Sequence, residues 1–545
     1  MPNPLSMRRV KTLRALAAAL LLVGVGGIRL AHAADPAVDP GPTPKAQCGP
    51  GSRPETSAQG RVPAGDVTSG RAAQGYTCNT QLLSHYGRNG GYRVHRYVDG
   101  AGHECAFYDS TLLFPTNTLS PPGNSPGVYV LDMADPAHPV RTAALTTPAM
   151  LSPHESLNLN TKRGLLVADL GNPITAPGWV DIYDVSQDCR HPVLKSSTPL
   201  GILGHEGTFS PDGNIFWVSS TGGHTITALD ITNPTMPVPL WLGTQWVAHG
   251  MNVSDDGNRL YVADIANFDP TAGLTILDVS QVQQHKPNPQ VKVVSHLSWP
   301  EVSIPQTAIP VTINGHPYLV EVDEFARQVS SDPKMPVGAA RIIDIADDTK
   351  PKVVSNIRLE ANMPANRAGD ERNDPGANSA LQGYAAHYCA VPSRVEPGVV
   401  ACSFILSGMR LFDIRDPLHP KELAYANFLG TNSQGATSAY AMSAPAFVPE
   451  RGDVWYTDGN SGFYALHVTN GVWPFTTAAA GAAKLTAVAA ATASRNQPAP
   501  KSSTPPAAAP SAQLAVTGGQ MPVGAAAALF GLGFLLLRVR RSLKT

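Results

Sequence analysis

The chain has 545 residues, a formal net charge of −1 and only 15% charged residues, so nothing in its composition indicates nucleic acid or an anionic membrane surface as a partner. Its 50 prolines and 49 glycines are typical of a chain with many short turns. The even number of cysteines, without a Cys-x-x-Cys pair, favours disulfides over a metal–thiolate site. The cysteines are Cys48, Cys78, Cys105, Cys189, Cys389 and Cys402.

Residues 1–34 have the pattern of a secretory signal peptide. Basic residues precede the apolar stretch Ala15–Ile28, and Ala31-His32-Ala33 offers a small-x-small cleavage site. Cleavage after Ala33 or Ala34 would leave residues 35–91 as an N-terminal extension. A retained signal anchor is the alternative. Either interpretation predicts an exported protein.

A recurrent phrase, Asp-hydrophobic-x-Asp/Asn-Pro-x-x-Pro, follows short β-rich runs along the chain. Clear copies start at Asp132, Asp230 and Asp413, and looser copies start at Asp184, Asp278 and Asp344. A period of about 45 to 70 residues built from short strands and Pro turns is typical of a β-propeller. In each copy we expect the Asp to accept backbone N–H bonds within the turn, where the prolines fix φ. His138, His191 and His419 belong to these turns, and we expect them to be solvated.

The strand openings predict the number of blades, and the end of the last blade predicts how the ring closes. Openings fall near His103, His154, His205, His249, Gln306, His387 and Ser443. The predicted fold is therefore an all-β, seven-bladed β-propeller of four-stranded antiparallel blades, spanning residues 92–474. The seventh blade stops after its third strand, so we expect the N-terminal run Tyr92–Val98 to supply the missing outer strand. Cys389 and Cys402 fall on neighbouring strands of one hairpin and are the first predicted disulfide, while the pairing of the other four cysteines stays open.

The third strands of these repeats resemble a known family. Gly408–Ile414 and Leu274–Val279 resemble the LVIVD repeat of bacterial surface and secreted propellers, and the resemblance runs from about Tyr92 to Pro474. It implies the propeller fold. Because most members of that family lack an established activity, the resemblance implies little chemistry, and function has to be argued from the site.

Histidines at the strand openings are the candidate site. His103, His154 and His205 are each followed by Glu and recur at equal spacing, and His249 and His387 open two further blades. First strands line the channel of a propeller, so the five imidazoles are expected at one channel mouth, with His103, His154 and His205 the favoured subset. Imidazole and carboxylate together suit Zn, Cu, Fe or Mn. The carboxylates expected at the same end are Asp169, Asp264, Asp323, Glu324 and Asp458.

A structural role for these histidines is the competing interpretation. In WD-type propellers, a His before the first strand bonds to an Asp of its own blade and holds the blade together without binding a ligand. Five long segments also project from the same predicted face, where loops on a rigid scaffold usually carry recognition. They are Thr116–Gly127, Leu170–Gly178, Ile265–Gly273, Glu324–Gly338 and Ala361–Ala386.

Three functions follow from these features. The first is a binding or scaffold module that recognises a surface protein or glycan through the His-bearing face. The second is a metal-dependent extracellular enzyme with a His/carboxylate site at the channel mouth, and the third is a structural surface-layer component. No nucleophile elbow, phosphate loop or His-Glu-x-x-His helix is present, so no catalytic residue is assigned.

The C-terminal residues predict surface attachment. Residues 475–513 are rich in Ala, Pro, Ser and Thr and are expected to form a solvated linker. Leu514-Ala515-Val516-Thr517-Gly518, the apolar helix 521–537 and a basic tail resemble a cell-wall sorting signal in its Leu-Ala-x-Thr-Gly variant, spanning 514–545. The resemblance implies that a sortase cuts after Thr517 and joins the chain to the cell wall. A plain membrane anchor is the alternative, and both place the protein at the cell surface.

Overall fold

The computed structural model describes residues 41–475, apart from 111–125, 172–174, 267–270, 327–331, 333, 376, 378–381 and 432–436, together with residue 38. The chain divides into two units, residues 1–481 and 482–545, and all of the described residues belong to the first. The predicted signal peptide, nearly all of the linker and the sorting signal lie outside them. No helix within the described part of the chain is long and apolar enough to cross a membrane.

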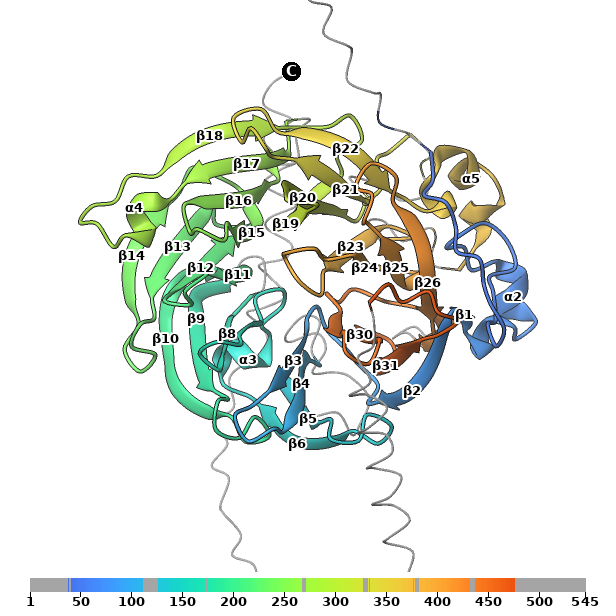
Figure 1. The fold of residues 1–545 in the computed structure, drawn as a ribbon, viewed down its shortest axis with the longest axis horizontal. Helices are drawn as coiled ribbons and strands as arrows, with labels where there is room; N and C mark the ends of the chain where they lie inside the picture. The colour runs from blue at the N-terminus through green and yellow to red at the C-terminus, as the bar shows by residue number, and fades with distance from the viewer. Residues whose placement is uncertain are drawn as a thin grey trace, which may run out of the picture. The chain divides into compact units, whose positions relative to one another are not determined.

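Seven antiparallel sheets stand as blades around a central channel, with the first strand of each blade nearest the axis (Figure 1). The predicted seven-bladed β-propeller is therefore confirmed. Blades 1 to 3 contain β3 (Val94–Val98), β4 (Glu104–Asp109), β5 (Val128–Asp132), β6 (Val140–Leu145); β7 (Asn158–Asn160), β8 (Leu165–Asp169), β9 (Thr175–Asp184), β10 (Val193–Gly204); and β11 (Glu206–Phe209), β12 (Ile215–Ser220), β13 (Thr225–Asp230), β14 (Val238–Gly243).

Blades 4 to 7 follow in chain order. Their strands are β15 (Ala248–Val253), β16 (Arg259–Asp264), β17 (Gly273–Asp278), β18 (Lys292–Leu297); β19 (Ile304–Ile313), β20 (His316–Glu324), β21 (Ala340–Asp344), β22 (Lys352–Ile357); β23 (Ala386–Ala390), β24 (Val399–Phe404), β25 (Gly408–Asp413), β26 (Lys421–Asn427); and β29 (Ala446–Val448), β30 (Asp453–Asp458), β31 (Gly462–Val468). The short helices are α2 (Ala64–Thr68), α3 (Pro148–Leu151), α4 (Ser280–Gln283), α5 (Pro364–Ala368), η1 (Ala72–Gln74), η4 (Glu360–Asn362) and η5 (Asp370–Asn373), and β27 (Gly430–Thr431) pairs with β28 (Thr437–Ser438).

Burial explains why the middle strands are apolar without alternation. Every residue of β8, β12 and β30 is buried, because neighbouring blades pack face to face and cover both sides of these strands. By contrast, all but one residue in each of the outer strands β6 and β14 is exposed or half-buried. The core is therefore divided into clusters between adjacent blades, such as the one that joins Val167 of blade 2 to Phe216 of blade 3.

The recurrent Asp-Pro turns have the structural role that the sequence predicts. Asp132 Oδ1 accepts the Ala134 N–H at 2.9 Å, and the equivalent bonds recur in the turns that begin at Asp184, Asp230, Asp278, Asp344 and Asp413.

The turns also hold neighbouring blades together. Ser355 Oγ, on the outer strand of blade 5, donates to the Pro417 carbonyl of blade 6 at 2.6 Å, and Ser84 and Ser196 make the same contact to Pro136 and Pro234. The side chains of His138 and His419 are about four-fifths exposed, and His191 is also exposed, as expected.

An N-terminal strand does close the ring, but the predicted segment is wrong. The outer strand of blade 7 is β2 (Thr80–Tyr86), which pairs antiparallel with β31 over its whole length. Residues Val94–Val98 instead form β3, the first strand of blade 1, paired with β4. The physical reason is local: a short turn joins β3 to β4, so these two strands form a hairpin with each other.

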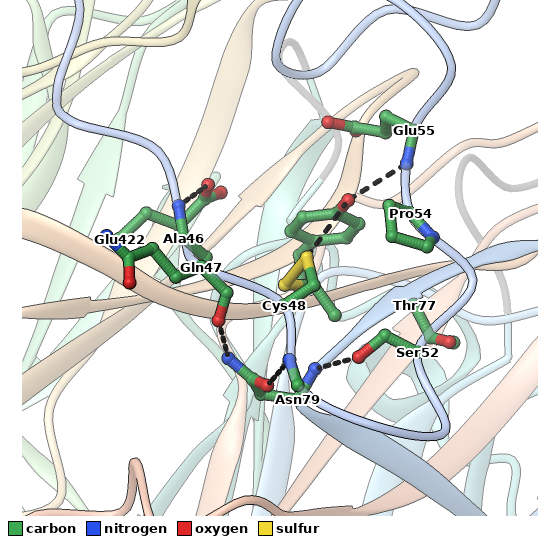
Figure 2. The surroundings of a disulfide bond; sticks show 12 residues. Ala46, Gln47, Cys48, Ser52, Pro54, Glu55, Thr77, Asn79 and Glu422 are labelled. Carbon is green, nitrogen blue, oxygen red and sulfur yellow. Dashed lines mark hydrogen bonds between the residues drawn. A yellow bond between two sulfur atoms is a disulfide. The ribbon is translucent and has the colours of Figure 1, made fainter.

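The N-terminal extension lies along blades 6 and 7. Its strand β1 (Tyr76–Cys78) adds a fifth strand to blade 6 by pairing with β26. Figure 2 shows the Cys48–Cys78 disulfide beside this strand, where Asn79 accepts the Gly49 N–H at 2.8 Å and donates to the Gln47 carbonyl at 2.9 Å. The fully buried Arg410 pairs with Glu55 of the extension and with Glu422 of β26. The extension is thus held to blade 6 by a strand pairing and a buried ion pair, while the disulfide joins two residues of the extension itself.

All six cysteines form disulfides. The predicted Cys389–Cys402 bond joins β23 to β24 within blade 6 and is confirmed. The sequence left the other pairings open, and the structure gives Cys48–Cys78 and Cys105–Cys189. Cys105–Cys189 connects β4 of blade 1 to the turn after β9, so it links two adjacent blades.

Glu371 is a buried carboxyl in the segment that leads to blade 6. It is 4% exposed and lines a cavity of about 10 Å³ with Arg367 and Tyr384, and its Oε2 has no hydrogen-bond partner within the described residues. Burial, helped by Asp374 and opposed by Arg367, raises the pKa of Glu371 to about 8. The folded protein therefore holds a proton on Glu371 that the unfolded chain releases above its ordinary pKa.

A Glu371→Gln variant should test this directly. Because the pKa of Glu371 is raised in the folded protein, this carboxyl stabilises the folded state fully only below its ordinary pKa. Between that pKa and pH 8, the free energy of unfolding falls by up to about 1.4 kcal/mol per pH unit. The Gln variant removes that slope, so its unfolding temperature should exceed that of the wild type at pH 8 and approach it near pH 5. Thermal unfolding across this range, with the half-exposed Glu301→Gln as control, measures the effect. Parallel curves for the Glu371 variant and the wild type would contradict it.

Candidate metal centre

Each blade contributes one residue to a ring of buried side chains where the first strands begin. The parallel bridges Arg93–Ala444 and Glu155–Glu206 join neighbouring blades and show which residues correspond. We call these residues the channel ring; each is 5% exposed or less. In blade order they are Tyr92, His154, His205, His249, Gln306, His387 and Ser443.

Four of the five predicted histidines belong to the channel ring, and His103 does not. Because β3 is the first strand of blade 1, His103 lies in the turn between β3 and β4, at the opposite end of the first strand. Its Nδ1 is 2.8 Å from Asp99 Oδ2 and 3.6 Å from Asp188 Oδ1, and Asp188 is also paired with Arg190. The prediction that His103 joins His154 and His205 is therefore wrong, and Tyr92 takes the corresponding position in blade 1.

The rings of three histidines are held by backbone carbonyls of neighbouring blades. The Nδ1–carbonyl distances are 3.1 Å for His205 and Gly171, 2.8 Å for His249 and Pro305, and 2.7 Å for His387 and Met442. A carbonyl can only accept, so each Nδ1 donates and each Nε2 faces the channel. This is how proteins orient metal-binding imidazoles. Within the part of the chain that the structure describes, none of these three rings bonds to an Asp of its own blade, so the WD-type interpretation is wrong for them.

Two histidines and two glutamates form a closed four-membered arrangement across the channel. Glu155 lies between His249 and His387, with Oε2–Nε2 and Oε1–Nε2 distances of 3.3 Å each. Glu324, at the end of β20, faces the same two imidazoles at 3.4 and 2.8 Å. Gln306 donates to Glu155 Oε1 at 2.8 Å and fixes the carboxylate. Both glutamates are 5% exposed or less.

These separations match the spacing of ligands around one metal ion. A first-row ion lies about 2.0 to 2.2 Å from each His nitrogen or carboxylate oxygen, which places adjacent ligands roughly 3 to 3.5 Å apart. Three of the four nitrogen–oxygen distances fall in that range and the fourth is 2.8 Å, although His249 and His387 face different oxygens of each carboxylate. One donor atom from each of Glu155, His249 and Glu324 lies within 4.8 Å of the others, and His387 lies beside both carboxylates. The donor set, two imidazoles and two carboxylates, suits Zn, Fe or Mn. We call these four residues the primary donor set: His249, His387, Glu155 and Glu324.

The charges of the primary donor set also suit a divalent cation. Burial opposes protonation of His249, but Glu324 and Glu155 overcome it and raise the pKa of His249 to about 10. In the same way, burial is outweighed by the bonds of His387 to Glu155 and Glu324, which raise its pKa to about 9. Both imidazoles therefore favour the protonated form beside these glutamates. One divalent ion in place of the two protons leaves the net charge unchanged.

A second buried layer adjoins the channel ring. Arg93 Nη2 donates to Glu206 Oε1 at 2.7 Å and to the Tyr388 hydroxyl at 3.1 Å, while Arg93 Nε donates to the Glu155 carbonyl at 2.9 Å. Burial raises the pKa of Glu206 to about 7, against the effect of Arg93. A Cβ at Gly250 would lie 1.8 Å from Glu206 Oε2, so only glycine allows this carboxyl to reach its position.

The predicted carboxylates divide into one donor and four others. Glu324 faces the channel histidines, whereas Asp323 binds Arg341 at 2.9 Å and Asp458 accepts the Tyr440 N–H at 2.6 Å. Asp264 accepts from Thr275, and Asp169 is fully buried behind His205. Sequence reasoning missed Glu155 as a donor. The His-Glu pairing at 154–155 was visible, but residues adjacent on a strand usually point to opposite faces, and only the structure shows Glu155 turned into the channel.

Comparison with known proteins adds a likeness of fold. No family model and no curated protein match the chain. Among solved structures, a putative 6-phosphogluconolactonase from Bacteroides fragilis is 10% identical, with a TM-score of 0.39, covering 63% of this chain and 90% of its own. The periplasmic gluconolactonase of Pseudomonas aeruginosa is 12% identical (TM-score 0.40; 63% and 92%), and Kuenenia stuttgartiensis hydrazine synthase is 11% identical (TM-score 0.42; 71% and 97%). At this level nothing about activity follows.

Proposed function

We propose that this protein is an exported β-propeller that binds a divalent first-row transition metal ion at the channel end, through the primary donor set. One observation carries the proposal: the Nε2 atoms of His249 and His387 alternate with the carboxylates of Glu155 and Glu324 in a closed, buried arrangement. Of the functions that the sequence predicts for this face, the proposal takes the metal ion from the second, and recognition of a surface protein or glycan remains a separate expectation. We propose no reaction for it.

Metal binding and not stability alone explains this arrangement best. Buried ion pairs of this kind are weak evidence for stability, because desolvation of the charges offsets much of their attraction. A purely structural ring would be served as well by apolar side chains. Instead, two imidazoles and two carboxylates lie together, and the carbonyl tethers of the two imidazoles come from two different blades.

Metal analysis of purified protein tests this proposal. After incubation with Zn²⁺ or Mn²⁺ and gel filtration, the wild type should retain at least one ion per chain. His387→Ala and Glu324→Gln each remove a donor and should weaken binding by at least about 100-fold, more than the loss of an outer partner. His138→Ala, whose side chain is 82% exposed in an Asp-Pro turn, is the matched control and should bind as the wild type does. Metal-free wild type, or a His387 variant that binds normally, would overturn the proposal.

We also propose surface display, with the LVIVD-type propeller carried beyond the linker. Three disulfides support an oxidising compartment, as expected for an exported chain. Mass spectrometry of protein released from the native cell surface should give a mature chain that begins after Ala33 or Ala34 and ends at Thr517. Mature protein that still carries Gly518–Thr545 would refute sortase cleavage and leave the membrane anchor.

A further inference from the structure

Two imidazoles of the channel ring lie outside the primary donor set. The side chains of His154 and His205 are 6% and 4% exposed, and their ring centroids are 4.6 Å apart. His205 Nε2 is 3.1 Å from Glu155 Oε2, and His154 Nδ1 is 3.8 Å from the same oxygen. One ligand atom from each of His154, Glu155 and His205 lies within 4.8 Å of the others. They form a second group of donors, which shares Glu155 Oε2 with His249.

His154 is a buried histidine with a left-handed backbone conformation, which His224 and His285 also adopt in turns. Its φ is +51°, in the left-handed region, which costs a non-glycine residue about 1 to 3 kcal/mol and is kept mainly at functional positions. Unlike the other channel histidines, it has no carbonyl tether: its Nδ1 is buried without a hydrogen-bond partner among the described residues. The strain and the unpaired nitrogen both direct this ring toward Glu155.

Glu155 lies between the two groups. Its Oε2 faces His205 on one side and His249 on the other, at 3.1 and 3.3 Å, while its Oε1 faces His387. A carboxylate in this position can share its oxygens between two ions. Two-metal sites hold their ions about 3.5 to 4 Å apart.

We infer that the channel holds a second metal position, formed by His154 and His205, with Glu155 as the bridging ligand to the ion in the primary donor set. The inference rests on the proposed function, since it requires the first ion. Its ligands are two divalent first-row ions. The asymmetry of the channel ring agrees with it: the histidines occupy consecutive blades 2, 3 and 4 and then blade 6, so they flank Glu155 from both sides.

Stoichiometry separates this inference from the proposal on which it rests. The wild type, saturated with Mn²⁺ and freed of excess ion by gel filtration, should retain two ions per chain, and His154→Ala should retain one. Electron paramagnetic resonance should show a coupled Mn²⁺ pair in the wild type and an isolated Mn²⁺ in the variant. The control is His103→Ala, which removes the Asp99–His103–Asp188 group at the far end and should leave both ions bound.

Each outcome has one meaning. No retained ion in the wild type would overturn the proposed function and this inference together. If the wild type retains one ion and His154→Ala retains it too, the second position alone is overturned. Two uncoupled ions in the wild type, one of which is lost in His103→Ala, would also overturn the second position alone. If His154→Ala does not fold, His205→Asn takes its place. The number of ions that the wild type retains, and their coupling, still test the second metal position.

Discussion

Replacing Arg410 by methionine is expected to lower the free energy of unfolding by about 3 to 5 kcal/mol, because it leaves two buried carboxyls without their cation. The Arg410 side chain is fully buried and pairs with both Glu55 and Glu422, and its guanidinium also stacks on Tyr425. Methionine fills similar space but cannot pair with either carboxylate. The loss therefore measures uncompensated charge more than lost volume.

The pH dependence of this loss is a second signature. Even beside Arg410, burial raises the pKa of Glu55 to about 7. Without the arginine, the carboxyls must take up protons to stay buried, so the folded variant binds more protons than its unfolded chain and loses stability as pH rises. Denaturant unfolding at pH 5.5 and 8 should show the larger deficit at pH 8.

Arg415→Met is the matched control. Arg415 pairs with Asp413 in a turn of the same blade, but its side chain is 59% exposed, so its removal should cost no more than about 1 kcal/mol. Equal losses for the two variants would contradict the account of Arg410. Adding Glu55→Gln to Arg410→Met should recover part of the deficit at pH 8.

Replacing Thr80–Tyr86 with a Gly–Ser sequence of equal length should abolish the folded monomer. This segment is β2, and its loss leaves β31 as an unpaired edge that can pair with other chains. It also removes the Ser84 bond to Pro136, which links blade 7 to blade 1. Size-exclusion chromatography with light scattering should show aggregates in place of the wild-type species.

The same replacement in the seven-residue segment 284–290, between β17 and β18, is the control and should leave the elution unchanged; all but one of its residues are exposed. It alters as much sequence and removes no strand of a blade. A monomer with wild-type unfolding temperature after replacement of β2 would show that the ring does not depend on this strand.

The sequence predicted the blades well because each Asp-Pro turn repeats the same local chemistry. Asp132, Asp230 and Asp413 each bond to the backbone two residues on, and that bond is readable from local sequence. Strand assignment at the N-terminus failed because Thr80–Tyr86, with Leu82 and Leu83 adjacent, lacks the alternation of a half-buried strand. Local pattern also does not say which segment pairs with a strand far along the chain. The same error placed His103 at the start of the first strand of blade 1, whereas it lies between the first and second strands.

The candidate site could be predicted only in part, for a different reason. His154, His205, His249 and His387 share a position on the first strands, so repeat alignment finds them. His103 has the same sequence spacing but lies at the opposite end of the first strand of its blade. The roles of Glu155 and Glu324 depend on how blades 2 and 5 face each other across the channel, and the carbonyl tethers come from neighbouring blades. Neither relation is expressed in nearby sequence.

The pairing of β2 with β31 also sets an order of events in biosynthesis. One strand of the seventh blade is made near the start of translation, and the strand that it pairs with is made near the end. At about 5 to 20 residues per second, the interval between Thr80 and Val468 is roughly 20 to 80 s. Throughout that time blade 7 cannot be completed, and the ring that Ser84 helps to close remains open. A chaperone or export factor that holds the nascent chain must therefore act until nearly the whole propeller has been synthesised.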